Sequence, residues 1–183
     1  MFMRMTRILL GAMLVFTCLS SGAKGVYMEP KAFLEEAFGA EPFTMQTLWL
    51  NTEDKQRGRE IFNRDYQGFR LRYWQGGEKT AWIMDEVGKT RPITFGVLIE
   101  DGRIEKLDVL EFRESRGWEI RHPFFTRQFV GLSLQDGDLS AQVDGITGAT
   151  LSVAAAKRIA RFALYLHGRT DLARQPRSVP VNE

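Results

Sequence analysis

The sequence predicts an α+β fold, with a twisted, half-barrel-like antiparallel sheet of at least four strands flanked by helices. Two observations predict the sheet: apolar and polar residues alternate in residues 68–75, and Asp101-Gly102, a strong hairpin signal, separates two strand-like segments. A third predicts the main helix, because residues 150–167 carry apolar side chains at helical spacing. The 183 residues are enough for one domain with a sizeable core.

Two helices are expected before the sheet. The first covers residues 30–38, where Pro30 suits a first helical turn and an apolar face follows. The second covers residues 52–63, with its first threonine as a candidate N-cap. This second helix is mostly polar, so its acidic residues Glu53 and Asp54 are interpreted as solvated charges.

Four strands are expected, arranged as two consecutive hairpins. A Gly-Gly pair separates the strands of the first hairpin and the Asp-Gly pair those of the second, which are the residues that tight turns require. In the third strand, every second residue is apolar, so one face is expected to be buried. The four segments are residues 68–75, 79–87, 93–100 and 103–113.

An irregular loop and a small apolar helix are expected in residues 114–131. Pro123 suits the start of this helix, and Phe125 and Phe129 lie on one side of it. Asp136-Gly137 predicts a further turn.

The long helix of residues 150–167 is expected to end at Gly168 as its C-cap. Its apolar residues recur at the spacing of a buried face, and its basic residues are interpreted as solvated. The predicted buried residues are Ala155, Ile159, Phe162, Ala163 and Leu166, and the predicted solvated ones are Lys157, Arg158 and Arg161.

The two ends of the chain are interpreted separately from the domain, which is assigned to residues 24–168. Residues 1–23 are typical of a secretory signal peptide: two arginines precede a short apolar run, and Ser21-Gly22-Ala23 is a candidate cleavage site. Export to the periplasm is therefore expected, with an uncleaved anchor at the inner membrane as the alternative. Residues 169–183, with two prolines and several charges, are expected to form a flexible tail.

Cleavage of the signal would change the charge and the cysteine content. The formal net charge would fall from +2 to about zero because Arg4 and Arg7 would be lost, so nucleic acid is not an expected partner. Cys18, the single cysteine, would also be lost, so the exported domain would have no disulfide partner and no thiol chemistry. His122 and His167 lack the spacing of a metal site, and none is expected. No catalytic residue is assigned either.

Residues 144–150, Asp-Gly-Ile-Thr-Gly-Ala-Thr, lead into the alanine-rich start of the long helix. Thr150 or Ser152 is a candidate N-cap, and the free N–H groups of a first helical turn attract anions such as phosphate. From spacing alone, an ordinary capped turn is the favoured explanation of the segment. No Walker A lysine and no Gly-x-Gly-x-x-Gly pattern is present.

This segment resembles the flavinylation motif of the FMN-binding domain family, Asp-x-x-Thr-Gly-Ala-Thr followed by Ser. The family includes flavin-bearing periplasmic subunits of the sodium-pumping quinone reductase and of the Rnf complex. The resemblance implies that Thr150 carries FMN through a phosphoester bond, placed there by a flavin transferase that uses FAD. The resemblance also implies that five neighbouring residues belong to the cofactor site: Asp144, Thr147, Gly148, Ala149 and Ser152.

A second segment resembles the family's Glu-Thr-Pro-Gly-x-Gly motif and the aromatic helix after it, which help to enclose the flavin. Glu114, Gly117, Phe129 and Gly131 match this pattern, whereas Ser115, Arg116 and Glu119 depart from it and indicate a distinct subfamily. The resemblance covers about residues 68–167. Candidates to contact the flavin ring are Trp118, Phe124, Phe125 and Phe129, and candidates to place a positive charge beside it are Arg116 and Arg121.

The resulting hypothesis is an exported flavoprotein that transfers electrons between a membrane donor and a periplasmic or membrane acceptor. No second, substrate-binding domain is predicted, which favours an electron carrier over a self-sufficient oxidoreductase. Two alternatives stay open. One is a non-redox binding or sensing domain of the same fold, and the other is a reductase that acts directly on a small acceptor such as a metal ion or a quinone.

Overall fold

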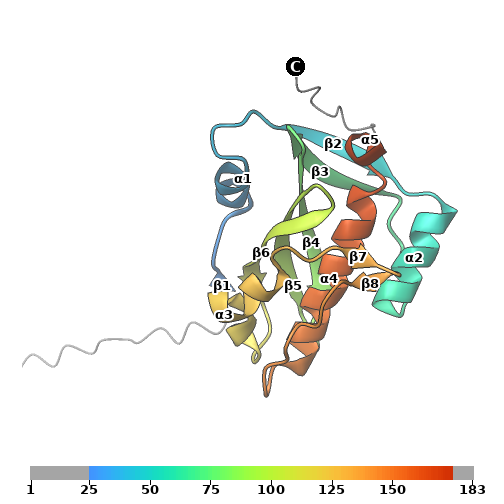
Figure 1. The fold of residues 1–183 in the computed structure, drawn as a ribbon. Coiled ribbons are helices and arrows are strands. Elements are labelled where there is room, and N and C mark those ends of the chain that lie inside the picture. Colours follow the sequence, from blue (N-terminus) through green and yellow to red (C-terminus); the bar gives the residue numbers. More distant parts are fainter. Residues whose placement is uncertain (1–24, 175–183) are drawn as a thin grey trace, which may run out of the picture.

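The computed structural model describes residues 25–174, which form an α+β fold, as the sequence predicts (Figure 1). Its centre is an antiparallel sheet of six strands in the order β1-β6-β5-β4-β3-β2, which is not closed into a barrel, and β7 and β8 form a separate small hairpin. The strands are β1 (Gly25–Val26), β2 (Thr44–Trp49), β3 (Arg70–Gly76), β4 (Lys79–Val87), β5 (Pro92–Glu100), β6 (Arg103–Phe112), β7 (Leu134–Gln135) and β8 (Asp138–Leu139).

Helices cover both faces of the six-stranded sheet. Helix α1 packs on β4, β5 and β6 from one side, and α4 packs on the same strands from the other side, with α2 beside it (Figure 1). The helices are α1 (Pro30–Phe38), α2 (Thr52–Phe62), η1 (Trp118–Arg121), α3 (Pro123–Thr126), η2 (Arg127–Phe129), α4 (Thr150–His167) and α5 (Asp171–Arg174).

Both predicted hairpins are confirmed, with strand ends within two residues of the expected ones. Gly76 pairs with Lys79 at the end of β3 and β4, and Glu100 pairs with Arg103 at the end of β5 and β6. In the second hairpin, Asp101 and Gly102 both have positive φ, which is the backbone conformation that an Asp-Gly turn favours.

Strands β1 and β2 were not expected from the sequence. Strand β2 pairs along its whole length with β3, yet only Leu48 within it is even partly buried. A strand at the edge of a sheet that is exposed on both faces lacks the alternation of apolar and polar residues by which strands are recognised.

The main core lies between α4 and the sheet, and the predicted buried face of α4 is confirmed. All five residues predicted for that face have no exposed surface, and they pack with Trp82, Phe95 and Val97 of the central strands. A smaller core lies under α1 on the opposite face, around Phe33. Because α4 is fixed along its length on the sheet, the position of its first turn is also fixed.

The interpretation of several charged residues as solvated was wrong. Asp54 has no exposed surface: its carboxylate accepts hydrogen bonds from the Asn51 N–H, from the Tyr165 hydroxyl and from the Arg169 guanidinium. Burial alone would raise the pKa of Asp54, but these bonds outweigh it and hold that pKa below its ordinary value. The N-cap of α2 is accordingly Asn51, in a capping box with Asp54, and not Thr52.

On α4, two of the three basic residues expected in solvent bind other parts of the fold. Arg158 forms an ion pair with the buried carboxylate of Glu86, which also binds Arg64. Arg161 donates hydrogen bonds to the carbonyl oxygen of Gly137 in the β7–β8 turn. These arginines join α4 to the end of β4 and to the small hairpin.

Folded structure continues beyond residue 168, where the flexible tail was expected to begin. Arg169 is bound to Asp54, Thr170 is buried, and α5 follows. The expected signal peptide and residues 175–183 of the expected tail lie outside the described residues. Within residues 25–174, no helix is both long enough and apolar enough to cross a membrane.

We predict that Asp54→Ala lowers the free energy of unfolding by about 3 kcal/mol, because the substitution removes the carboxylate half of the Asn51–Asp54 capping box and the partner of Arg169. Urea denaturation followed by circular dichroism would measure this. Glu53→Ala is the matched control, since Glu53 is exposed in the same helical turn and should cost less than about 1 kcal/mol. Equal effects of the two substitutions would contradict the role of Asp54 as the buried partner of Arg169.

Candidate functional site

Helix α4 begins with Thr150, which is exposed at the first helical position. The N-cap is Ala149 and no side chain caps this end, so the expectation that Thr150 or Ser152 would be the cap was wrong. The first N–H with a helical partner is that of Val153, which donates to the carbonyl oxygen of Ala149. The N–H groups of the first turn are therefore available to an anion near the Thr150 hydroxyl.

The loop before α4 is anchored at both of its ends and open between them. At its start, the Asp144 N–H donates to Oε1 of Gln128 at 2.7 Å, which attaches the loop to η2. At its end, the Ala149 N–H donates to the carbonyl oxygen of Ile146, and Ala149 is buried. Asp144, Thr147 and Gly148 are exposed, and the positive φ of Gly148 (84°) turns the chain into the helix.

The segment after β6 lies directly against the first turn of α4. A Cβ atom placed on Gly117 would be 2.5 Å from Oγ of Ser152 and 3.4 Å from Cα of Ala149. Gly117 also has a φ of 87°, a conformation that side chains other than hydrogen disfavour. The two sequence segments that resemble the FMN-binding family therefore meet at this contact, although Gly117 lies more than thirty positions before Ala149 and Ser152 in the chain.

Glu114 holds the opposite side of this region in place. Its carboxylate is buried and accepts hydrogen bonds from the backbone N–H groups of Lys89, Thr90 and Arg91 in the turn between β4 and β5. Burial alone would raise the pKa of Glu114, but the three N–H donors outweigh it and lower that pKa below its ordinary value. Glu114 thus acts on the β4–β5 turn, which its sequence match did not indicate.

The aromatic residues expected near a flavin ring occupy three different environments. Phe125 and Phe129 have no exposed surface and pack edge to face in the main core, with ring centroids 5.4 Å apart. Phe124 is 63% exposed, and Trp118 is partly exposed next to Gly117. Of these four, Trp118 and Phe124 have ring surface exposed to solvent, whereas Phe125 and Phe129 support the segment from within.

Trp118 is fixed by its neighbours. The guanidinium carbon of Arg121 lies 4.9 Å from the centroid of the Trp118 ring and 4.4 Å from that of the Tyr27 ring. The His122 ring meets Trp118 from another side at 5.4 Å and also stacks on Phe124. Arg121 therefore lies between two aromatic rings, while Arg116 is exposed.

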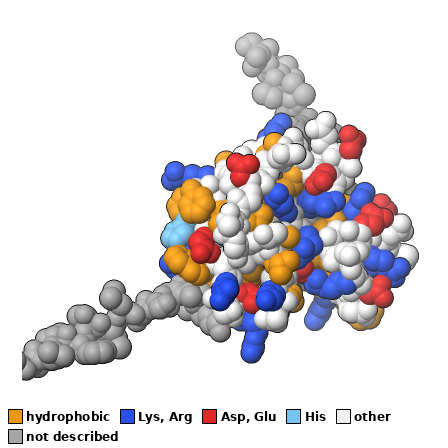
Figure 2. All heavy atoms as spheres, turned by 90° about the horizontal axis from the view of Figure 1, so that it is seen from below, with side chains coloured by type: hydrophobic (Ala, Val, Ile, Leu, Met, Phe, Trp, Pro, Cys, Tyr) orange, Lys and Arg blue, Asp and Glu red, His pale blue; other side chains and the backbone are white. Residues whose placement is uncertain are grey.

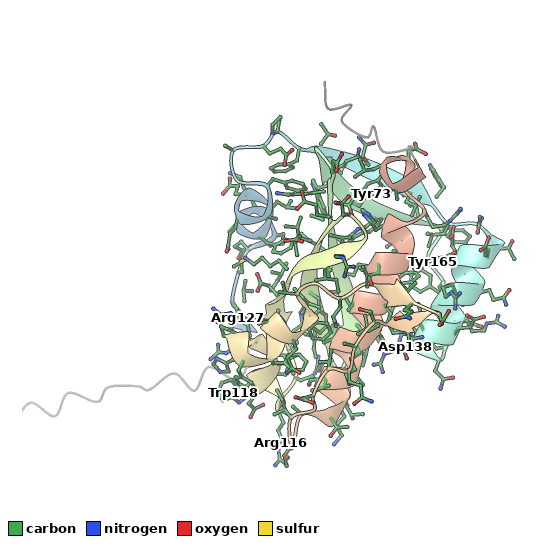
Figure 3. All side chains as sticks on the ribbon, in the orientation of Figure 1. Tyr73, Arg116, Trp118, Arg127, Asp138 and Tyr165 are labelled. Atoms are coloured by element: carbon green, nitrogen blue, oxygen red, sulfur yellow. The ribbon has the colours of Figure 1, made fainter. Side chains whose placement is uncertain are left out.

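This end of the molecule combines apolar and basic surface. Figure 2 views it from the side on which α4 begins and shows hydrophobic side chains together with lysine and arginine side chains, with acidic side chains among them. Figure 3 places the side chains of Arg116 and Trp118 at the same end. Exposed residues in the segments that the contacts above connect are Lys89, Arg91, Arg116, Phe124 and Leu151.

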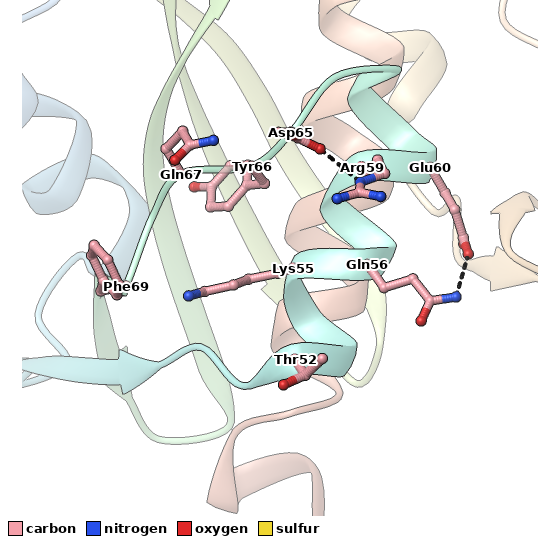
Figure 4. Close-up of a pocket in the computed structure, with 9 residues that line it drawn as sticks. All are labelled: Thr52, Lys55, Gln56, Arg59, Glu60, Asp65, Tyr66, Gln67 and Phe69. Carbon is pink, nitrogen blue, oxygen red and sulfur yellow. Dashed lines mark hydrogen bonds and ion pairs between the residues drawn. The ribbon is translucent and has the colours of Figure 1, made fainter.

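A separate pocket lies between α2 and the segment that leads into β3 (Figure 4). Its basic side chains have partners within the pocket: Arg59 forms an ion pair with Asp65 at 2.8 Å, and Lys55 lies over the Phe69 ring. The pocket also borders Tyr66, which packs on Phe162, twelve residues along α4 from Thr150. It is therefore a different region from the start of α4.

The fold and this site define a small α+β ligand-binding domain in which an uncapped helix start is exposed for an anion. Residues 88–165 match the family model described as the FMN-binding domain, and a search of the curated proteins gives no match. This part of the chain belongs to the FMN-binding domain family, so the protein is a flavin-binding protein with FMN as its cofactor. The matched region begins at the β4–β5 turn and includes both segments that meet at Gly117.

Several residues that build the site were not found from the sequence. Gln128 acts through its side-chain amide on the backbone of Asp144, and the turn of residues 89–91 contributes three backbone N–H groups and the Thr90 hydroxyl. Backbone donors carry no residue signature. A single glutamine also looks the same in sequence whether its amide binds the chain or water.

We predict that Gly117→Ala lowers both the stability and the amount of bound FMN, because the new Cβ would displace the first turn of α4. Gly131→Ala is a matched control: Gly131 has a similar φ of 80°, but a Cβ there meets no atom within 4 Å. The cost of Gly117→Ala should exceed that of Gly131→Ala by about 1 kcal/mol or more. Chemical denaturation and flavin absorbance per chain measure the two effects, and adding Ser152→Ala should recover part of each.

We also predict that Glu114→Gln lowers the free energy of unfolding at neutral pH by about 2 kcal/mol, since a neutral amide replaces a charged acceptor. The ionised Glu114 stabilises the fold above its unfolded-state pKa of about 4.3. Because the folded-state pKa is lower, this stabilisation is lost as the pH falls through it. The difference between wild type and variant should therefore shrink below about pH 4. A difference that stays constant in acid would contradict this role.

Proposed function

We propose that the protein is an exported electron-transfer flavoprotein that carries FMN covalently on Thr150. The observation that carries this proposal is the exposed hydroxyl of Thr150 at an uncapped helix start, in direct contact with the Gly117 segment, inside the region that matches the FMN-binding domain. The resemblance of residues 144–150 to the flavinylation motif supports the same residue independently of the geometry.

The residues present at this site fit the phosphate group of FMN. A phosphoester on Thr150 Oγ would lie next to the unpartnered N–H groups of the first turn of α4, which stabilise negative charge. Gly148, where an added Cβ would meet no atom within 4 Å, leaves room beside it. Attachment from FAD would exchange the pyrophosphate bond of FAD for the bond to Thr150, with release of AMP, which is the reaction of a flavin transferase.

The residues that would hold the ring are those that present aromatic surface beside Thr150. Trp118, which is held by Arg121, is partly exposed next to Gly117, and Phe124 offers a second, exposed ring. Arg116 and Arg121 supply positive charge, and positive charge near a flavin favours its reduced, anionic form. When bound, FMN supplies one- and two-electron redox chemistry, and the chain supplies position, charge and apolar surface.

Electron transfer requires a redox partner that reaches the same end of the molecule. The exposed apolar and basic residues around Thr150 support a partner that docks there, at the membrane or in the periplasm. Export rests on the sequence of residues 1–23. A covalent bond would keep the flavin attached in a compartment in which free FMN is scarce.

We predict that Thr150→Val abolishes covalent flavin while Thr150→Ser, which keeps a hydroxyl, retains the capacity for it. Each variant would be co-expressed with a flavin transferase and analysed by intact mass, by fragmentation of the flavinylated peptide and by flavin fluorescence after denaturation. Because Thr150 is exposed, each substitution should change the protein's free energy of unfolding by less than about 0.5 kcal/mol. Covalent flavin in Thr150→Val, or an unmodified mass of the wild type after co-expression, would contradict the attachment.

A further inference from the structure

Strand β2, at one edge of the six-stranded sheet, is the strongest feature of the described structure that FMN binding leaves unexplained. It is six residues long, five of its side chains are exposed, and neither a charged residue nor a proline occurs between Phe43 and Asn51. Natural proteins usually protect an exposed edge strand with charges, prolines, bulges or a covering element, because its free backbone groups pair readily with another strand. An uncharged edge of this length therefore indicates a strand that pairs.

The backbone groups of β2 that face outward can be assigned from its pairing with β3. The Leu50 N–H donates to the carbonyl oxygen of Phe69, and in an antiparallel ladder the residues that bond to a neighbour alternate along the strand. Leu48, Gln46 and Thr44 therefore direct their N–H and C=O groups toward β3. Met45, Thr47 and Trp49 direct theirs to the free edge.

The side chains of the same three residues are arranged symmetrically about Thr47. Met45 and Trp49 are 54% and 67% exposed, and both lie on the face of the sheet that carries Thr47. A two-fold axis through Thr47 would place each Thr47 opposite its copy and each Met45 opposite the Trp49 of the other chain. Sulfur–aromatic contacts of this kind are favourable.

We propose that β2 pairs with β2 of a second copy of this chain, which joins the two sheets into one continuous antiparallel sheet. The three outward-facing residues of each copy would exchange about six backbone hydrogen bonds across the axis. The occupant is a second copy because the edge is self-complementary about Thr47 and contains no charge that would select a different partner. This dimer does not depend on the flavin attachment proposed above.

The experiment is the oligomeric state of the purified full-length chain, measured by sedimentation and by light scattering over a range of concentrations. We expect a dimer whose dissociation depends on concentration, since a single strand pair buries a small interface. Thr47→Pro removes the central donor of the pair but no bond to β3, because the Thr47 N–H faces outward, so the fold is preserved. Thr47→Lys instead places two like charges opposite each other at the axis.

Both substitutions at Thr47 should weaken the dimer at least about tenfold while the circular dichroism spectrum is unchanged. The control is Val130→Lys, which adds the same charge at an exposed apolar residue beside β6, with three strands between it and β2. This variant should dimerise like the wild type. A wild type that is monomeric at all concentrations would overturn the proposal and leave the edge to a strand of another protein. A dimer that survives both Thr47 substitutions would overturn it as well.

Discussion

The packing of α4 on the central strands is the constraint on which the rest of this structure depends. The apolar face of the helix is buried along its whole length, from Val153 to Leu166, so the helix cannot move along the sheet without opening the main core. Its first turn is consequently held at one end of the molecule, beyond the edge of the packed region. There Gly117 is close enough to Ser152 that even a methyl group would not fit, so the β6–η1 segment and the helix start form one unit.

Elements that obey a simple periodicity could be predicted from the sequence. The two central hairpins and α4 each have an apolar face against the core, and the turns between the strands contain the glycines that their backbone conformations need. Strand β2 has no such face, and its pairing is decided by its neighbour β3, so its own sequence does not reveal it. Charges posed a different difficulty. Asp54 and Glu53 are adjacent carboxylates on one helix, and only the distant Tyr165 and Arg169 distinguish the buried one from the exposed one.

The candidate site follows the same division between local and long-range information. Residues 144–150 could be singled out because their composition is unusual over a short stretch and resembles a family motif. The prediction that a hydroxyl side chain caps α4 was wrong. A threonine before a helix usually caps it, but here the chain turns at Gly148, which has a positive φ, and Thr150 is the first residue of the helix. This difference matters chemically: a hydroxyl that capped the helix would be bound to a backbone N–H, and an exposed hydroxyl at the first position is accessible.

The openness of the site agrees with a cofactor held by a bond rather than by enclosure. Ligands bound only by non-covalent contacts are usually buried for most of their surface in a concave, apolar pocket. The start of α4 offers instead an exposed loop, one helix end and a few aromatic and basic side chains. A phosphoester would remove the need for a deep pocket and leave an edge of the flavin accessible to a partner, as electron transfer requires. The buried carboxylate of Glu114 and the amide of Gln128 then have one shared purpose, which is to keep the backbone around that exposed point rigid.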